Sequence, residues 1–225
     1  MLELSKTIET LRANVQTHAM DPMNPPMILP VTKMQSVDRI ESLRETGLTA
    51  IGENRVQELL EKYPRLSSTF TIHLIGRLQT NKIKYIIGKV CMVQSLDRMS
   101  LAEALHAHAA AHGVRLPVLV EVNISGETQK AGVTPDMAES FICEASRLDG
   151  IQIQGLMAVM PFTDPETIRP LFRAMRVLYD RLRARAVGNV SMDVLSMGMS
   201  GDWHVAAQEG STLLRIGSAI FGNRE

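Results

Sequence analysis

The feature that most restricts the fold is an alternation along almost the whole chain, in which short apolar runs rich in β-branched residues take turns with longer helical stretches. Most of these runs are continuously apolar, which is typical of parallel strands that helices cover from outside. We therefore predict an α/β fold built on a parallel sheet. The predicted strands span Met27–Lys33, Leu48–Asn54, Phe70–Gly76, Lys89–Ser95, Pro117–Asn123, Ile151–Met160, Val190–Met197 and Thr212–Gly217.

Helix start and stop signals fall between these runs. Asp164 followed by Pro165 predicts a capped helix with proline at its first position, and Thr134 followed by Pro135 repeats that pattern. Gly113 is a stop signal for the helix before it. The predicted helices and helical turns span Met1–Met20, Ser36–Thr46, Arg55–Tyr63, Gln79–Ile86, Arg98–His112, Thr134–Leu148, Asp164–Ala186 and Asp202–Gln208.

Eight strands, each followed by a helix or a helical turn, predict a closed parallel barrel. We expect one domain over residues 1–225: a (β/α)8 barrel of the TIM type over residues 27–225, preceded by an extra helix over residues 1–20. A doubly wound open sheet is the alternative, because strand order cannot be read from one sequence. A barrel places functional groups at the C-terminal ends of its strands, so the polar residues there are the candidates for a site.

The charge balance and the cysteine content narrow the class of function. Lys plus Arg and Asp plus Glu both number 24, so the net charge of zero gives no long-range attraction to nucleic acid or to acidic membranes. The two cysteines, Cys91 and Cys143, are too few for a disulfide framework, and we expect both to be buried, inert thiols. The N-terminus carries charges instead of a secretory signal, and no apolar run reaches the length of a membrane span. We therefore expect a cytoplasmic protein.

Lys33 closes the first predicted strand, which is otherwise apolar. A lysine in that position is partly desolvated, and desolvation lowers the pKa of an amine. A neutral amine attacks aldehydes, so the position indicates Schiff-base chemistry. The plainer interpretation is a lysine whose stem covers apolar surface while its ammonium group stays in water.

Two glycine- and serine-rich loops form the second signal. Ser196–Gly201 follows the seventh strand, and Gly217-Ser218 follows the eighth. Glycines let a backbone approach an anion, and barrels often bind phosphate at these two loops. Ordinary turn and cap chemistry is the alternative. Arg215 stands just before the second loop, and three interpretations are open: its guanidinium points into the site, clamps a phosphate or forms a surface ion pair.

The remaining polar residues carry weaker indications. Asn54 and Asn123 can bond the edge of a ligand, but asparagines also finish strands by capping the turn. We expect His73 in the core or the barrel wall and His204 on a helix surface. The histidines of the predicted helix over residues 98–112 have no further ligand nearby in sequence, so we expect no metal site.

The motifs taken together resemble the pyridoxal phosphate homeostasis proteins, which are similar to the N-terminal barrel domain of alanine racemase. They run from the first strand to the last, and the last two are the most specific. The matching stretches are Pro30–Lys33, Ile51–Glu58, His73–Lys82, Val120–Glu127, Gly155–Met157, Leu195–Asp202 and Gly210–Ser218.

The resemblance implies a function in vitamin B6 homeostasis, with pyridoxal 5′-phosphate (PLP) as the cofactor, client enzymes that use PLP as possible partners, and no established turnover. It implies a monomer, or a weak dimer at most. Seven residues would hold the cofactor: Lys33 as an internal aldimine, Ser200, Gly217 and Ser218 on the phosphate with Ser196 nearby, Arg215 by the pyridine nitrogen, and Asn54 near the ring.

The chain departs from the family pattern at two places. A histidine usually stands where this chain has Arg77, and Trp203-His204 stands where an aromatic or aliphatic residue is usually followed by glutamate. These departures put in doubt contacts around the site, but not the lysine or the phosphate loops.

Two alternatives to a PLP carrier stay open. A slow amino-acid racemase needs an acid/base group on each face of the cofactor, and alanine racemase takes the second, a tyrosine, from a further β-rich domain of its partner subunit. We expect that domain to be missing here, and Tyr63, Tyr85 and Tyr179 fall in predicted helices. An arginine at the ring nitrogen would also weaken the electron sink. The second alternative is a barrel enzyme that acts on a phosphorylated metabolite without PLP.

Overall fold

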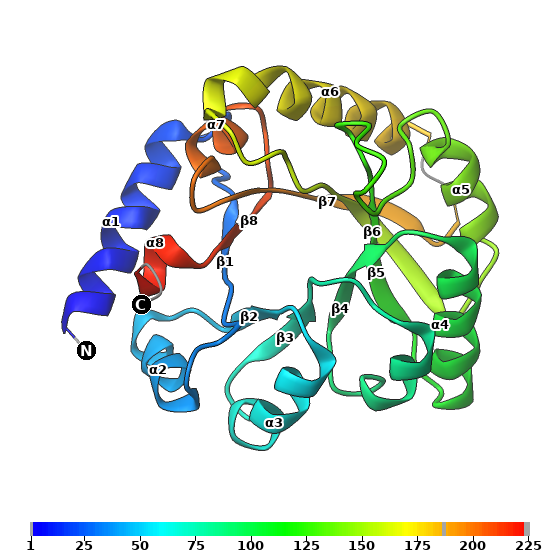
Figure 1. The fold of residues 1–225 in the computed structure, drawn as a ribbon, viewed down its shortest axis with the longest axis horizontal. Helices are drawn as coiled ribbons and strands as arrows, with labels where there is room; N and C mark the ends of the chain where they lie inside the picture. The colour runs from blue at the N-terminus through cyan, green and yellow to red at the C-terminus, as the bar shows by residue number, and fades with distance from the viewer. Residues whose placement is uncertain (1, 186–187, 223–225) are drawn as a thin grey trace.

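The first and last strands of the sheet pair with each other, as a closed barrel requires. The computed structural model describes residues 2–185 and 188–222, and its sheet has the order β1-β8-β7-β6-β5-β4-β3-β2 with every strand parallel to its neighbours (Figure 1). The strands are β1 (Met27–Pro30), β2 (Ala50–Glu53), β3 (Thr71–Leu74), β4 (Met92–Leu96), β5 (Leu116–Glu121), β6 (Ile151–Met157), β7 (Val190–Met199) and β8 (Leu213–Ile216).

A short contact between β1 and β2 completes the barrel. Val31 and Gly52 form a parallel bridge, and the backbone N–H of Thr32 donates to the carbonyl oxygen of Gly52 over 3.0 Å. The predicted (β/α)8 barrel is therefore confirmed, and the open doubly wound sheet is wrong. The closing contact lies directly before Lys33, so the end of β1 is fixed where the site was predicted.

Helices cover the outside of the barrel, and the extra helix α1 packs against η1, α7 and α8 (Figure 1). Ile8, Leu11 and Val15 of α1 are buried at the spacing of one helical face. The helical elements are α1 (Leu2–His18), α2 (Val37–Glu41), η1 (Ser42–Thr46), α3 (Val56–Leu66), η2 (Thr80–Tyr85), α4 (Met99–Ala111), α5 (Ala138–Ala145), α6 (Pro165–Arg183), α7 (Trp203–Gln208) and α8 (Ser218–Phe221).

The two proline-marked helix starts have different outcomes. Asp164 caps α6 as predicted, because its side chain accepts from the backbone N–H of Thr167. The start predicted at Thr134 is wrong, since α5 begins at Ala138. Val133 still pairs with Val122 as an isolated bridge, which keeps the chain extended up to that point. The predicted end of the α6 helix at Ala186 lies outside the described residues.

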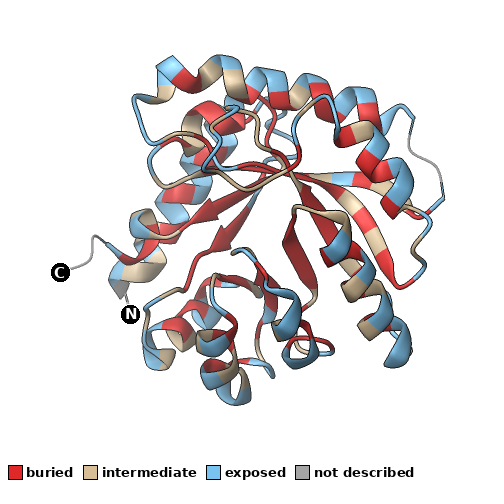
Figure 2. Ribbon diagram, turned by 45° about the vertical axis from the view of Figure 1, so that its right-hand side comes forward, coloured by how far each residue is buried: buried red, intermediate tan, exposed pale blue. Residues whose placement is uncertain are grey.

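Burial follows the layers of the barrel. Most strand positions and the inner faces of the helices are buried, while the outer helix faces are exposed (Figure 2). The expectation of two buried thiols is wrong: Cys143 is exposed on α5, whose inner face is formed by Phe141, Ile142 and Ala145, and Cys91 is half-buried just before β4. That strand begins at Met92, because the turn that ends η2 continues to Val90.

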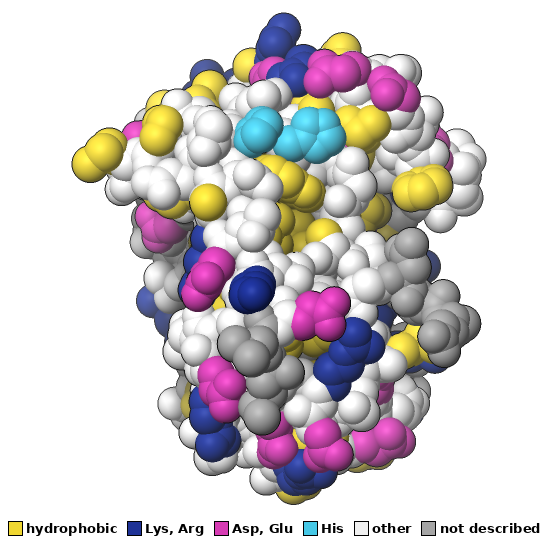
Figure 3. All heavy atoms as spheres, turned by 90° about the vertical axis from the view of Figure 1, so that its left-hand side faces the viewer, with side chains coloured by type: hydrophobic (Ala, Val, Ile, Leu, Met, Phe, Trp, Pro, Cys, Tyr) yellow, Lys and Arg dark blue, Asp and Glu magenta, His cyan; other side chains and the backbone are white. Residues whose placement is uncertain are grey.

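Acidic and basic side chains are interspersed over the face that carries α1, with hydrophobic patches between them (Figure 3). Within residues 2–185 and 188–222, no helix combines the length and the apolarity that crossing a membrane requires.

Candidate functional site

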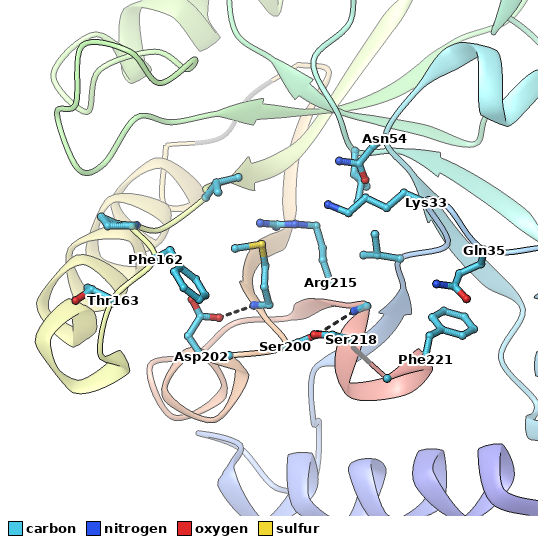
Figure 4. Close-up of a pocket in the computed structure, with 18 residues that line it drawn as sticks. Lys33, Gln35, Asn54, Phe162, Thr163, Ser200, Asp202, Arg215, Ser218 and Phe221 are labelled. Atoms are coloured by element: carbon cyan, nitrogen blue, oxygen red, sulfur yellow. Dashed lines mark hydrogen bonds between the residues drawn. The ribbon is translucent and has the colours of Figure 1, made fainter. Parts of the chain in front are cut away.

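A cavity of about 560 Å³ opens at the C-terminal ends of the strands. Its wall comes from the ends of β1, β2, β7 and β8 and from the loop that follows β6 (Figure 4). Of the seven residues predicted to hold a cofactor, six line this cavity: Lys33, Asn54, Ser200, Arg215, Gly217 and Ser218. Residues from the two ends of the chain thus meet in one site because the barrel closes between β1 and β8.

Lys33 and Asn54 form one side of the cavity. Lys33 is half-buried, as predicted, and its side chain extends toward Asn54 (Figure 4). The Oδ1 atom of Asn54 is buried and has no hydrogen-bond partner among the described residues. A buried acceptor without a donor costs about 1–3 kcal/mol, so this oxygen indicates a donor supplied by a ligand.

The backbone of Asn54 is held by a close approach from the neighbouring strand. A Cβ atom on Gly76 would lie 2.2 Å from the carbonyl oxygen of Asn54, so only glycine fits there. The position of the asparagine is therefore set by the strand ends and does not depend on a flexible loop.

Arg215 of β8 forms a second side of the cavity, and it is almost fully buried. Its Nη1 donates to the carbonyl oxygen and the Oγ of Ser196, over 2.9 and 2.6 Å, and its Nη2 donates to the carbonyl oxygen of Ala158 over 2.8 Å. A guanidinium has five N–H groups, so these three bonds leave two for a ligand. Burial lowers the pKa of Arg215 to about 10, against the opposing effect of Asp202 and Glu121, and the group stays charged at neutral pH.

A chain of neutral side chains continues from Arg215 through the barrel interior. Ser196 Oγ donates to Gln94 Oε1 over 2.8 Å, and Gln94 Nε2 lies 3.1 Å from His73 Nδ1. Because Gln94 accepts from Ser196 through its oxygen, its nitrogen donates, and His73 accepts as a neutral ring. Burial agrees with this state, because it lowers the pKa of His73 to about 4. The predicted core position of His73 is confirmed.

Ser196 is the predicted cofactor residue that does not line the cavity. It is fully buried behind Arg215, where it orients the guanidinium. Its predicted place near a phosphate stays a prediction, whereas its contacts support a role in seating Arg215. Sequence reasoning missed Gln94 because a lone glutamine inside an apolar strand carries no signal of its partners.

The two predicted phosphate loops are joined by one side chain. Ser200 Oγ accepts from the backbone N–H of Gly217 over 3.0 Å (Figure 4). It also accepts from the backbone N–H of Ala219 over 3.2 Å. Asp202, which the sequence did not single out, accepts from the backbone N–H of Met199 over 2.6 Å, and burial raises the pKa of its carboxyl group. The loops after β7 and β8 thus form one cradle at the edge of the cavity.

The rim also contains aromatic residues that sequence reasoning missed. Phe162, in the loop after β6, is completely exposed beside the opening, and Phe221 of α8 lines the wall. An isolated phenylalanine next to proline gives no sequence signal of a pocket.

The two departures from the family pattern lie outside the cavity wall. The Arg77 side chain is largely exposed, and its Nε lies 3.5 Å from Oδ2 of the buried Asp97 side chain. His204 of α7 is half-buried, with its ring edge-on to Trp203 at 5.8 Å between centroids. Asn123 caps the turn after β5 by accepting from the backbone N–H of Gly126.

Comparison with known proteins places this arrangement in a family. The family described as "Alanine racemase, N-terminal domain" matches residues 7–225. A pyridoxal phosphate homeostasis protein from Aquifex aeolicus is 42% identical over 88% of this chain and 87% of its own length. Another, from Pasteurella multocida, is 34% identical over 100% of this chain and 99% of its own. The chain belongs to the pyridoxal phosphate homeostasis protein family.

Solved structures agree with the assignment to the pyridoxal phosphate homeostasis proteins. The chain is similar to PipY of Synechococcus elongatus with PLP bound, at a TM-score of 0.85 and 28% identity, over 97% of this chain and 100% of PipY. An alanine racemase from Clostridium difficile, at 15% identity and a TM-score of 0.76, shares the fold, and this chain covers 56% of it. The predicted family and the predicted barrel are both confirmed.

Proposed function

We propose that this pyridoxal phosphate homeostasis protein binds PLP in the cavity between Lys33 and Arg215, as a Schiff base on Lys33, and that it buffers or delivers the cofactor. One observation carries the proposal: an amine, a buried acceptor without a partner and a seated guanidinium surround the same cavity of about 560 Å³. The PLP-bound relative PipY supports the choice of ligand.

The polar groups of the cavity fit the parts of PLP. The joined loops of Ser200 and Gly217-Ser218 offer a cradle for the phosphate. The two remaining N–H groups of Arg215 suit a pyridine nitrogen that accepts, and Asn54 Oδ1 suits a donor at the ring edge. Bound PLP supplies an aldehyde that reacts with amines.

The chemistry proposed for Lys33 is reversible. With PLP bound, the Lys33 amine in its neutral form would condense with the aldehyde, and its two protons would leave with the aldehyde oxygen as water. Hydrolysis would reverse the condensation and return the free aldehyde. A reversible covalent link protects a reactive cargo while still allowing it to leave, which suits a buffer or a donor to client enzymes.

The same residues argue against a racemase as the main function. A second acid/base group is needed on the opposite face of the cofactor, but the tyrosines of the chain lie in α3, η2 and α6, away from the cavity wall. The hydroxyl of Tyr179 donates to the carbonyl oxygen of Met192 instead. Arg215 stays charged at neutral pH and can only donate, so a ring nitrogen that accepts from it would stay unprotonated, which would weaken carbanion stabilisation.

A transfer experiment tests the proposal. The protein is loaded with PLP, freed of excess cofactor and mixed with an apo-enzyme that needs PLP; we expect recovery of enzyme activity, with Lys84→Ala, an exposed lysine of η2, behaving as wild type. In parallel, the loaded protein is incubated with amino acids in deuterated water. Multiple turnovers of α-proton exchange that disappear in Lys33→Ala would establish the racemase instead. Absence of Schiff-base absorption would favour an enzyme that acts without PLP.

A further inference from the structure

A buried ionic cluster lies beside the segment that carries Lys33. Lys62 Nζ of α3 lies 2.8 Å from Glu53 Oε1 at the end of β2 and 2.6 Å from Glu58 Oε1 one turn earlier on its own helix. The side chains of Lys62 and Glu53 are 8% and 1% exposed. We call Glu53, Glu58 and Lys62 the ionic cluster.

The ionic cluster bonds to the residues on both sides of Lys33. On one side, Thr32 Oγ1 donates to Glu53 Oε1 over 2.6 Å, and Lys62 Nζ donates to the carbonyl oxygen of Thr32 over 2.7 Å. On the other side, the backbone N–H of Met34 donates to Glu58 Oε1. The three N–H groups of the Lys62 ammonium match its three acceptors, Glu53, Glu58 and Thr32, so this lysine is fully engaged.

The backbone after Lys33 also adopts a conformation that needs support. Met34 has a φ of +62°, in the left-handed region, which costs a residue other than glycine about 1–2 kcal/mol. The bond from Met34 to Glu58 holds the chain in this conformation. The segment between β1 and α2 therefore leaves the barrel in one direction, with Lys33 toward the cavity (Figure 4).

A buried ion pair is a poor source of stability, because desolvating the charges offsets most of their attraction. Burial raises the pKa of Glu53 although its bonds to Lys62 and Thr32 lower it, which is the balance expected of such a pair. What the ionic cluster supplies is a fixed geometry: three elements, the ends of β1 and β2 and the helix α3, meet at one ammonium group.

We propose that Lys62, together with Glu53 and Glu58, is a positioning residue that aims the amine of Lys33 at the aldehyde of the ligand. This inference rests on the proposed function, since it assigns a role in forming the link on Lys33. Lys62 does not itself react: its ammonium protons are engaged, and its role is to fix the two peptide units around Lys33. Orientation of this kind speeds an intramolecular reaction without a contact to the reacting atoms.

The test separates covalent linking from binding of the ring and phosphate. PLP and pyridoxine 5′-phosphate, which has an alcohol in place of the aldehyde, are titrated against wild type, Lys62→Met and Glu58→Ala. We expect both variants to link PLP about tenfold more slowly and to retain it more weakly, because the amine is less well aimed. Their affinity for pyridoxine 5′-phosphate should stay within about twofold of wild type, because the cradle and Arg215 are untouched.

Glu61→Ala is the matched control for Glu58→Ala, since Glu61 is an exposed glutamate on the same helix, and it should behave as wild type. Glu58 is the most exposed member of the ionic cluster, so its variant carries the test if Lys62→Met does not fold. Variants that link PLP at the wild-type rate, or that lose both ligands equally, overturn the positioning role and leave the proposed function standing. If wild type itself makes no link with PLP, the proposed function fails and this inference fails with it.

Discussion

The two sides of the cavity are held in place by different kinds of interaction. Around Lys33, the ionic cluster fixes the neighbouring peptide units with charges and leaves the lysine side chain, which we propose to react, directed at the cavity. Around Arg215, neutral acceptors bond the functional group itself, and the chain through Ser196 and Gln94 ends on a neutral His73. The amine that we propose to react must reach the ligand, so its supports fix the backbone around it. The guanidinium of Arg215 only donates, so its supports can hydrogen-bond the group itself.

The largest effect is expected from reversing the charge at Arg215. In Arg215→Glu, a carboxylate would face the carbonyl oxygens of Ser196 and Ala158, and we expect a loss of roughly 3 kcal/mol in the free energy of unfolding. The absorption spectrum of the PLP-loaded protein should also change, because a carboxylate favours a protonated ring nitrogen. Urea unfolding and absorption spectra check both effects. An unchanged spectrum would place Arg215 away from the ring.

A smaller effect is expected from interrupting the neutral chain. Gln94→Leu leaves Ser196 Oγ without its acceptor and His73 Nδ1 without its donor, so the free energy of unfolding should fall by about 1–3 kcal/mol. Affinity for pyridoxine 5′-phosphate should fall as well, because Arg215 loses its fixed orientation. Gln152→Leu, at a half-buried position of β6, is the control. If the two variants behave alike, the chain does not seat Arg215.

The stability of the hydrogen-bonded chain behind Arg215 should depend on pH through His73. An unfolded histidine takes up a proton below a pH of about 6.5, whereas burial lowers the pKa of folded His73 to about 4. The contribution of His73 to stability is therefore present above pH 6.5 and is lost as the pH falls toward 4. His73→Asn keeps an acceptor for Gln94 but cannot titrate, so it should remove roughly 2–3 kcal/mol of the acid destabilisation.

Comparison of wild type with this variant isolates His73 from other groups that titrate. Glu121 acts in the opposite direction, because burial, assisted by Asp97, raises its pKa to about 7, and its carboxylate therefore destabilises the folded protein as the pH rises. Unfolding curves at pH 4.5 and 7 measure the difference. Parallel pH profiles for wild type and His73→Asn would contradict a neutral histidine at the end of the chain.

The smallest effect is expected at a departure from the family pattern. Arg77 is largely exposed, and its ion pair with Asp97 is a single long contact of 3.5 Å. Arg77→His should therefore change the free energy of unfolding by no more than about 0.5–1 kcal/mol. PLP affinity should not change measurably. A large loss of PLP affinity, measured by titration, would mean that residue 77 does influence the binding cavity.

The contrast between the two sides also explains what the sequence could predict. Lys33 and the loops at Ser200 and Gly217 were identified because each is a local signal at the end of an apolar run. The barrel followed from the alternation of strands and helices, and closure then brought these signals together.

The hydrogen-bonded connection that holds Arg215 could not be predicted in the same way, although Arg215 and Ser196 were each identified. His73, Gln94, Ser196 and Arg215 lie on four strands and meet only across the barrel interior, so no local spacing connects them. The start of α5 was also missed: Val133 pairs with the distant Val122, and a turn closed by a bond from the Met137 N–H to the Thr134 carbonyl oxygen precedes the helix.

The most direct measurement is borohydride reduction of the PLP-loaded protein, followed by intact mass and peptide mapping. Reduction makes the link permanent, so the modified lysine can be read from its peptide. The account predicts one added pyridoxyl phosphate group, on the peptide that contains Lys33, and its loss in Lys33→Ala. A stable adduct on Lys82 or Lys84 with Lys33 unmodified, or no adduct in wild type, would contradict it.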